Sequence, residues 1–181
     1  EVDFYAGSFP VSRGEAISSV LDFRLREGDP ENNTCKFTVG ASEAGFGSNG
    51  HLSKRTSYLV SARISYLQFL FKAINLPFLP TFTDMQVKLK TRFDSRHELS
   101  FIALAGIDDM TLNDDPGGKE ANEFILAYFP VIQQEVLTTG LVYRYYYGSN
   151  NLSIFLSQSY LNNRNTKYSN NDDSSEDNLT L

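Results

Sequence analysis

The sequence contains no tryptophan, a single cysteine and only two histidines. One cysteine cannot form a disulfide within the chain, so an internal disulfide framework is excluded. Two histidines and one cysteine offer little material for Ser-His or Cys-His catalysis, or for a zinc site. The Gly-x-Ser-x-Gly nucleophile elbow is also missing. We therefore expect no enzyme activity, no cofactor and no metal site.

Basic charge and long apolar runs are scarce as well. The formal net charge is −6, which argues against a nucleic-acid partner, because such proteins present a basic face. No apolar run reaches about 18 residues, so the sequence predicts no transmembrane helix. Transmembrane β-strands escape that criterion, because each needs only about 9–11 residues and half of them are polar.

The chain is rich in phenylalanine and tyrosine, with 14 and 10 of its 181 residues, and its polarity alternates with a period of two. Successive side chains of a β-strand point to opposite faces, so this alternation predicts strands with one apolar and one polar face. A helical turn is expected at 67–75, a helix before Pro130, and a glycine-rich turn near Gly45 that leads into a short strand at 46–52. The asparagine-rich segment 162–178 is expected to be a long loop or a disordered tail. The fold class is therefore all-β, an antiparallel meander. The expected strands are 20–26, 35–42, 56–66, 82–93, 98–108, 131–147 and 151–160.

The expected connections alternate in length. They are short at 53–55, 94–97 and 148–150, and long at 67–81, 109–130 and 162–178. Transmembrane β-barrels have short turns on one rim and long loops on the other. The same strands would also suit a soluble β-sandwich that serves as a binding or adhesion module, or a small complete outer-membrane barrel with a passive role.

On the barrel interpretation, the two faces of each strand have different surroundings. Charged side chains are excluded from lipid and belong in the lumen. The predicted lumen-facing residues are Arg63, Asp84, Gln86, Lys88, Lys90, Arg92 and Arg144. The predicted lipid-facing residues are Tyr58, Val60, Ile64, Met85, Val87, Leu89, Leu141, Tyr143, Ile154 and Leu156.

Two motifs are similar to known ligand-binding motifs, but we interpret neither as a binding site. Residues 45–50 match the Gly-x-Gly-x-x-Gly dinucleotide fingerprint, but no helix is expected after them, so a hairpin turn is the preferred interpretation. The acid pairs Asp108-Asp109 and Asp114-Asp115 lack the spacing of an EF-hand. We interpret them as solvated loop residues.

Several stretches resemble TonB-dependent outer-membrane receptors, especially those of Bacteroidota. Residues 4–10 (Phe-Tyr-Ala-Gly-Ser-Phe-Pro) and 13–23 (Arg-Gly-Glu-Ala-Ile-Ser-Ser-Val-Leu-Asp-Phe) resemble the end of the plug domain of that family. Residues 54–63 resemble an early barrel strand, and 76–82 and 162–164 are similar to other segments of the group. The resemblance covers nearly the whole chain.

The resemblance implies a fragment of a larger protein. Residues 1–29 would be the C-terminal end of a plug domain, preceded by the rest of that domain, and 29 would mark its boundary. Residues 34–181 would be the incomplete N-terminal portion of a transmembrane β-barrel, with about seven strands in 34–164 and another beginning at 178–181. In the family, the plug fills a barrel of 22 strands.

The implied function is that of the family. The whole protein would bind a scarce solute, such as a siderophore, glycan or peptide, and import it into the periplasm. Its partners would be the TonB complex, reached through a segment outside this sequence, outer-membrane lipid and a surface lipoprotein. The implied location is the outer membrane of a Gram-negative bacterium.

Overall fold

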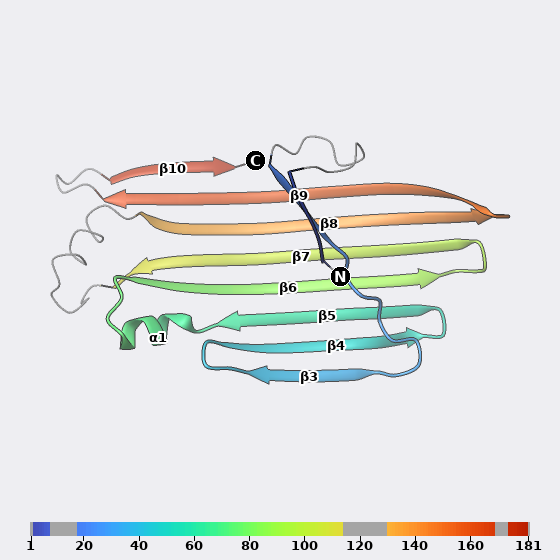
Figure 1. Ribbon diagram of the computed structural model, residues 1–181, viewed down its shortest axis with the longest axis horizontal. Helices are drawn as coiled ribbons and strands as arrows, with labels where there is room; N and C mark the ends of the chain where they lie inside the picture. The colour runs from blue at the N-terminus through green and yellow to red at the C-terminus, as the bar shows by residue number, and fades with distance from the viewer. Residues whose placement is uncertain (1, 8–17, 114–129, 169–173, 181) are drawn as a thin grey trace.

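The computed structural model describes residues 2–7, 18–113, 130–168 and 174–180, with only the backbone of 167–168 and 174–180. These residues form two antiparallel sheets and one short helix (Figure 1). Strand β1 (Val2–Ala6) pairs with β2 (Ser19–Phe23), and eight further strands form one meander in the order β3 to β10. The predicted all-β antiparallel meander is confirmed. Strands β3 and β10 are the two edges of this sheet.

The large sheet begins after a non-strand segment at 24–33, and each of its strands pairs with the next along the chain. The single helix, α1 (Leu67–Ala73), lies where the sequence predicts a helical turn before Pro77. The strands are β3 (Thr34–Val39), β4 (Glu43–Ser53), β5 (Thr56–Ser65), β6 (Phe78–Arg92), β7 (His97–Leu112), β8 (Val131–Tyr147), β9 (Asn150–Tyr168) and β10 (Ser174–Thr180).

The glycine-rich segment 45–50 lies inside β4, so the predicted turn is wrong, whereas the short strand expected at 46–52 is confirmed as part of β4. Its glycines do not form a turn, and they differ in how much space surrounds them. A Cβ atom at Gly47 would meet nothing within 4 Å, whereas one at Gly50 would lie 2.8 Å from the Asn33 Cα. The side chain of Asn33 accepts a 2.7 Å hydrogen bond from the backbone N–H of His51. The glycine therefore lets residue 33 approach the strand.

The asparagine-rich segment 162–178 was expected to be a loop or a disordered tail, and that expectation is wrong for its described parts. Strand β9 continues to Tyr168, and β10 begins at Ser174. Backbone pairing explains the difference, because residues 162–166 of β9 pair with residues 131–135 of β8. A ladder partner satisfies the backbone whatever the side chains are.

Other boundaries shift by a few residues. Strand β6 begins at Phe78 and includes Pro80, which the sequence places in a connection, and β2 ends at Phe23 rather than at residue 26. Strand β7 extends to Leu112, so Asp108 and Asp109 are strand residues rather than loop acids. Asp114, Asp115 and the helix expected before Pro130 lie outside the described residues.

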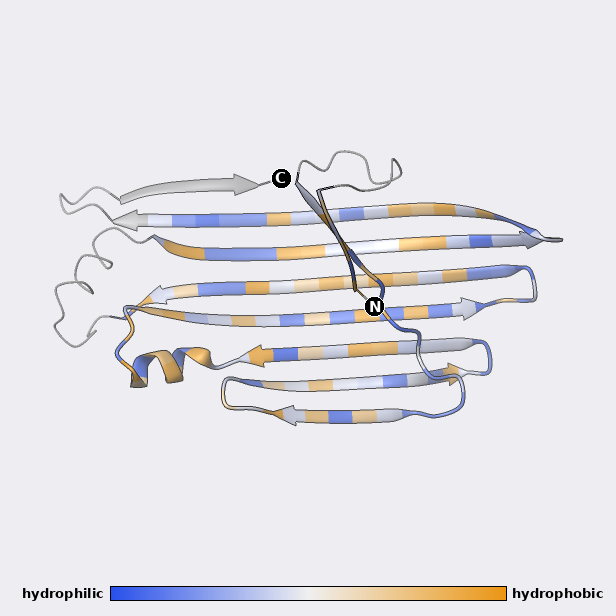
Figure 2. Cartoon of the chain, in the orientation of Figure 1, coloured by the Kyte–Doolittle hydropathy of each residue, from blue (hydrophilic) through white to orange (hydrophobic). Residues whose placement is uncertain are grey.

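The register sorts side chains into two chemically different faces. Along β5, β6 and β7, for example, Val60 is opposite Val87, which is opposite Ala103. One residue further on, Ser61 is opposite Gln86. Figure 2 shows the resulting alternation of hydrophobic and hydrophilic residues along the strands. We call the side that contains Val87 the apolar face and the side that contains Gln86 the polar face.

No apolar core is present among the described residues. None of their large hydrophobic side chains is buried, and several on the apolar face are widely exposed, with Met85 47 % exposed, Phe37 78 % and Leu156 69 %. The other sheet that the structure describes, β1–β2, consists of two short strands. Within the described ranges, no helix has both the length and the hydropathy to cross a membrane.

Candidate functional site

The structure places each predicted set of site residues on one side of the sheet. Through the strand register, the seven predicted lumen-facing residues, from Arg63 to Arg144, share the polar face. The ten predicted lipid-facing residues, from Tyr58 to Leu156, share the apolar face. The two shared faces are observed, whereas lumen and lipid as their surroundings stay predictions.

The apolar face carries a continuous band without charge. Residues directly opposite one another on neighbouring strands form rows across the sheet. In the rows of this face from that of Tyr145 to that of Leu137, no described residue of β3 to β9 is Asp, Glu, Lys or Arg. Eight residue steps separate Tyr145 from Leu137, in the last row before Glu135, and they span about 27 Å of strand, at roughly 3.4 Å per residue. With the usual strand tilt of about 40°, the band would be about 21 Å tall, slightly less than the roughly 25 Å of outer-membrane barrels. Thr139 and Gln158 are neutral polar residues near its middle.

Aromatic rings gather where the band meets the short turns. The rings of His97 and Tyr145 lie 4.9 Å apart, and those of Tyr145 and Tyr147 lie 5.8 Å apart. The hydroxyl of Tyr143 lies 2.5 Å from Nδ1 of His97. Tyrosines with an apolar body and a polar tip are typical of a membrane–water interface.

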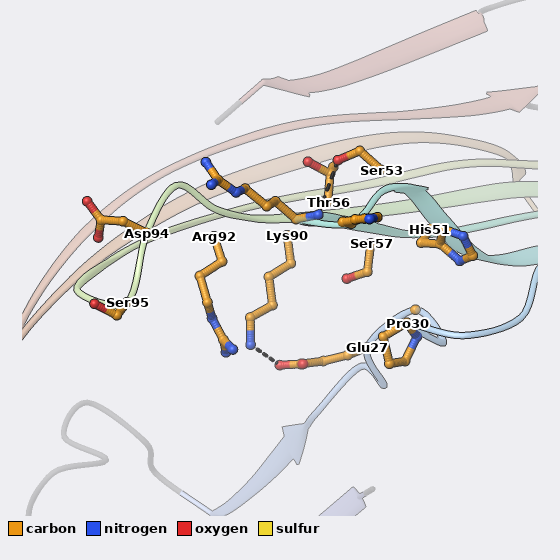
Figure 3. A pocket seen from close by; sticks show the side chains of 13 residues that line it. Glu27, Pro30, His51, Ser53, Thr56, Ser57, Lys90, Arg92, Asp94 and Ser95 are labelled. Carbon is orange, nitrogen blue, oxygen red and sulfur yellow. Dashed lines mark hydrogen bonds and ion pairs between the residues drawn. The ribbon is translucent and has the colours of Figure 1, made fainter.

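The polar face holds the chain segment that precedes the large sheet. The Lys88 ammonium donates a 2.9 Å hydrogen bond to the Leu25 carbonyl oxygen, and the Lys90 ammonium lies 2.6 Å from the Glu27 carboxylate. In Figure 3 the strands arch over the segment that carries Glu27, and Lys90 and Arg92 project toward it. The segment therefore lies on the polar side and leaves the apolar face uncovered.

Glu98 is the centre of a charge cluster near the short turns. Its carboxylate is bonded by Arg92 and Arg144, each at 3.1 Å, and by Lys90 at 3.2 Å. Glu98 is only 1 % exposed. The register creates this cluster, because Arg92, Glu98 and Arg144 are direct cross-strand neighbours.

Glu98 and Glu27 were not predicted from the sequence as partners of the predicted cations. A signal for Glu98 was available, because the turn after Phe93 returns the chain so that residue 98 faces residue 92. No local pattern connects Glu27 with Lys90, since the ion pair joins a non-strand segment to a distant strand.

Arg63 and Asp84 form a second charge pair toward the other end of the sheet. Their side chains are directly opposite and 2.8 Å apart, and Arg63 also lies 3.5 Å from Glu43. The guanidinium carbon of Arg63 lies 5.1 Å from the centre of the Phe82 ring. These groups are partly solvated, so the pair contributes little to stability.

Two cavities lie between the N-terminal segment and the polar face. The turn cavity, about 460 Å³, lies at the short turns and is lined by Glu27, Lys90, Arg92 and Asp94, among others (Figure 3). Backbone N–H groups of Arg96 and His97 hydrogen-bond the Asp94 carboxylate and lower its pKa. The linker cavity, about 420 Å³, lies beside residues 23–26 and has Gln86 in its wall. In the described ranges, no three His, Cys, Asp or Glu residues gather as a metal site would require.

Gly28 lies close against the backbone of the sheet. A Cβ atom there would collide with the Tyr58 carbonyl oxygen and lie 2.5 Å from the Gly50 carbonyl oxygen. Both are backbone atoms of paired strands, so they cannot move aside as a flexible side chain would. Because residue 28 has no side chain, the segment can lie directly against the sheet.

Gly28→Ala is expected to loosen this segment. Overpacking costs about 1–3 kcal/mol, so trypsin should cleave after Arg24 or Arg26 about tenfold faster if cleavage follows local opening. The matched control is Gly106→Ala, because a Cβ at Gly106 meets nothing within 4 Å. Equal cleavage rates in the two variants would contradict the close contact.

No family model, no curated protein and no solved structure matches this chain. The functional argument therefore depends on the two faces of the sheet and on the segment bonded to one of them.

Proposed function

We propose that this chain is part of a TonB-dependent outer-membrane receptor, which binds a scarce solute at the cell surface and imports it into the periplasm. In this proposal the large sheet is a portion of the barrel wall, its apolar face contacts lipid and its polar face lines the lumen. The segment on the polar face connects the end of the plug to the barrel. A siderophore, a glycan and a peptide are the candidate solutes.

One observation carries the proposal. The apolar face is free of charge over most of the apolar height of an outer-membrane barrel, and the N-terminal segment is bonded to the opposite face. In lipid, a charged side chain at the midplane costs about 2–4 kcal/mol, which explains such strict sorting. A soluble sheet would need a second layer to bury the same surface.

The connections between strands also support the proposal. Those at 54–55, 93–96 and 148–149 are short, whereas those at 66–77 and 113–130 on the opposite end are long. Barrels of the outer membrane distribute their turns in this way. The sequence predicts a third long connection at 162–178, but β9 and β10 occupy most of that range and leave only residues 169–173 between them. The connection at 40–42, on the same end, is also short.

The experiment is cell fractionation combined with a growth assay. The protein that carries this chain should fractionate with the outer membrane. Its deletion should abolish growth on one ferric chelate, glycan or peptide as sole source, and removal of TonB should have the same effect. Recovery in the soluble fraction would instead identify a β-sandwich binding module. Outer-membrane location with TonB-independent growth would identify a passive barrel.

A further inference from the structure

The linker cavity has the construction of a binding site. Its floor consists of two cross-strand rows on the polar face, and its roof is the segment at 23–26. One row runs from Thr34 through Asn49 to Leu59, and the next runs from Lys36 through Gly47 and Ser61 to Gln86. The bonds of the segment to Lys88 and Lys90 hold the roof over this floor.

Gly47 gives the cavity its depth. It lies directly opposite Lys36 on one side and Ser61 on the other, and a Cβ atom there would meet nothing within 4 Å. The open space is therefore next to a lysine, a hydroxyl and, one strand further, the amide of Gln86. Its volume of about 420 Å³ falls within the usual range for small-molecule sites, about 300–1,000 Å³.

The charges of the lining are all of one sign. The cavity is lined by Arg24, Arg26 and Lys36, and by no Asp or Glu. Arg24 is bonded to Asp3 and Asp22, at 3.3 and 3.4 Å. Arg26 and Lys36 form no ion pair with any residue that the structure describes. Two positive charges thus lack an internal counter-charge at a cavity wall.

The turn cavity differs in this respect. Its lining includes the carboxylates of Glu27 and Asp94, which would repel an incoming anion. Of its four cations, Lys90 and Arg92 are already paired with Glu98, whereas Lys54 and Arg55 form no ion pair with a described residue. The comparison selects the linker cavity, although the turn cavity is slightly larger.

We propose that the linker cavity binds a small organic anion through a carboxylate or phosphate group. Arg26 and Lys36 supply the charge, since a guanidinium binds such groups through paired N–H donors and an ammonium acts as a compact charge. The amides of Asn49 and Gln86 add neutral donors, and Phe23 and Leu59 provide an apolar wall for the rest of the ligand. The proposal does not require the apolar face to contact lipid.

The test uses phenyl phosphate as the probe and the full chain in zwitterionic micelles. Titration calorimetry should show saturable binding of phenyl phosphate and of benzoate, weaker binding of inorganic phosphate, and none of benzylamine. Inorganic phosphate lacks the ring that would contact the apolar wall. Binding of benzylamine at the strength of phenyl phosphate would overturn the assignment of an anion site.

Charge-removing variants locate the binding. Arg26→Gln and Lys36→Gln should each weaken phenyl phosphate binding about tenfold or more, the usual loss for a hydrogen bond to a charged group. Both side chains are exposed, so neither substitution should disturb the fold. The control is Lys54→Gln, which removes a cation from the lining of the turn cavity. Unchanged affinity in the Arg26→Gln Lys36→Gln double variant would refute the proposal.

A filling variant tests the same cavity without changing charge. Gly47→Phe places a ring in the open space and should abolish binding of phenyl phosphate, while the far-ultraviolet circular dichroism stays that of the unsubstituted chain. Full binding by Gly47→Phe, or no saturable binding by the unsubstituted chain, would exclude the linker cavity as the site.

Discussion

Replacing Val87 by arginine is expected to block insertion of the protein into the outer membrane. Val87 lies near the middle of the apolar band, opposite Val60 and Ala103. An arginine at the membrane midplane costs about 2–4 kcal/mol, a large part of the roughly 5–15 kcal/mol that stabilises a typical protein. The measurement is the amount of protein in the outer-membrane fraction, together with heat-modifiable electrophoretic mobility after folding into vesicles.

The adjacent substitution Gln86→Arg is the matched control. Residue 86 points to the polar face, in the same strand and at almost the same height, between Asp84 and Lys88. An arginine there can be solvated, so insertion should be unchanged. Equal loss, or equal tolerance, of the two variants would show that the faces do not differ as a lipid side and an aqueous side.

Glu98→Gln is expected to lower the free energy of unfolding by about 3 kcal/mol. The substitution leaves three cations, Lys90, Arg92 and Arg144, close together without their shared counter-charge. Breaking a buried ion pair typically costs about 3–5 kcal/mol. The side chains of Arg92 and Arg144 are 63 % and 38 % exposed, so water screens part of the repulsion and the low end applies. Urea unfolding in micelles, followed by tyrosine fluorescence, gives the value.

The comparison variant is Glu27→Gln. It removes the other carboxylate bonded to Lys90, but the side chain of Glu27 is largely exposed. A solvated pair of this kind contributes at most about 1 kcal/mol, so its loss should be small. If Glu98→Gln were no more destabilising than Glu27→Gln, Glu98 would not be the centre of the cluster.

The faces of the long strands could be predicted because alternation is a local property. Met85, Val87 and Leu89 lie on one face, with Gln86 and Lys88 on the other, and the register continues this sorting across β5 to β9. A period of two fixes the facing of a strand without knowledge of its partners. The helix α1 was also predictable from a local signal, because a helix has to end before Pro77.

Features that depend on partners were not predictable. The glycines of 45–50 read as a turn, yet Gly50 is needed where Asn33 approaches β4. The asparagines of 162–168 read as a loop, yet β8 provides their backbone partners. The Glu27–Lys90 pair joins residues far apart in the sequence. Each of these requires knowledge of which segments meet, and local propensity does not contain it.

Contact between the apolar face and lipid can be tested with a single fluorophore on each face. The sequence contains no tryptophan, so Met85→Trp and Gln86→Trp each introduce the only one. Both variants are folded into phospholipid vesicles with and without bromine atoms on the acyl chains. Tryptophan fluorescence should be strongly quenched in the Met85→Trp variant and little quenched in the Gln86→Trp variant. Equal quenching of the two, or none at residue 85, would contradict contact of the apolar face with lipid.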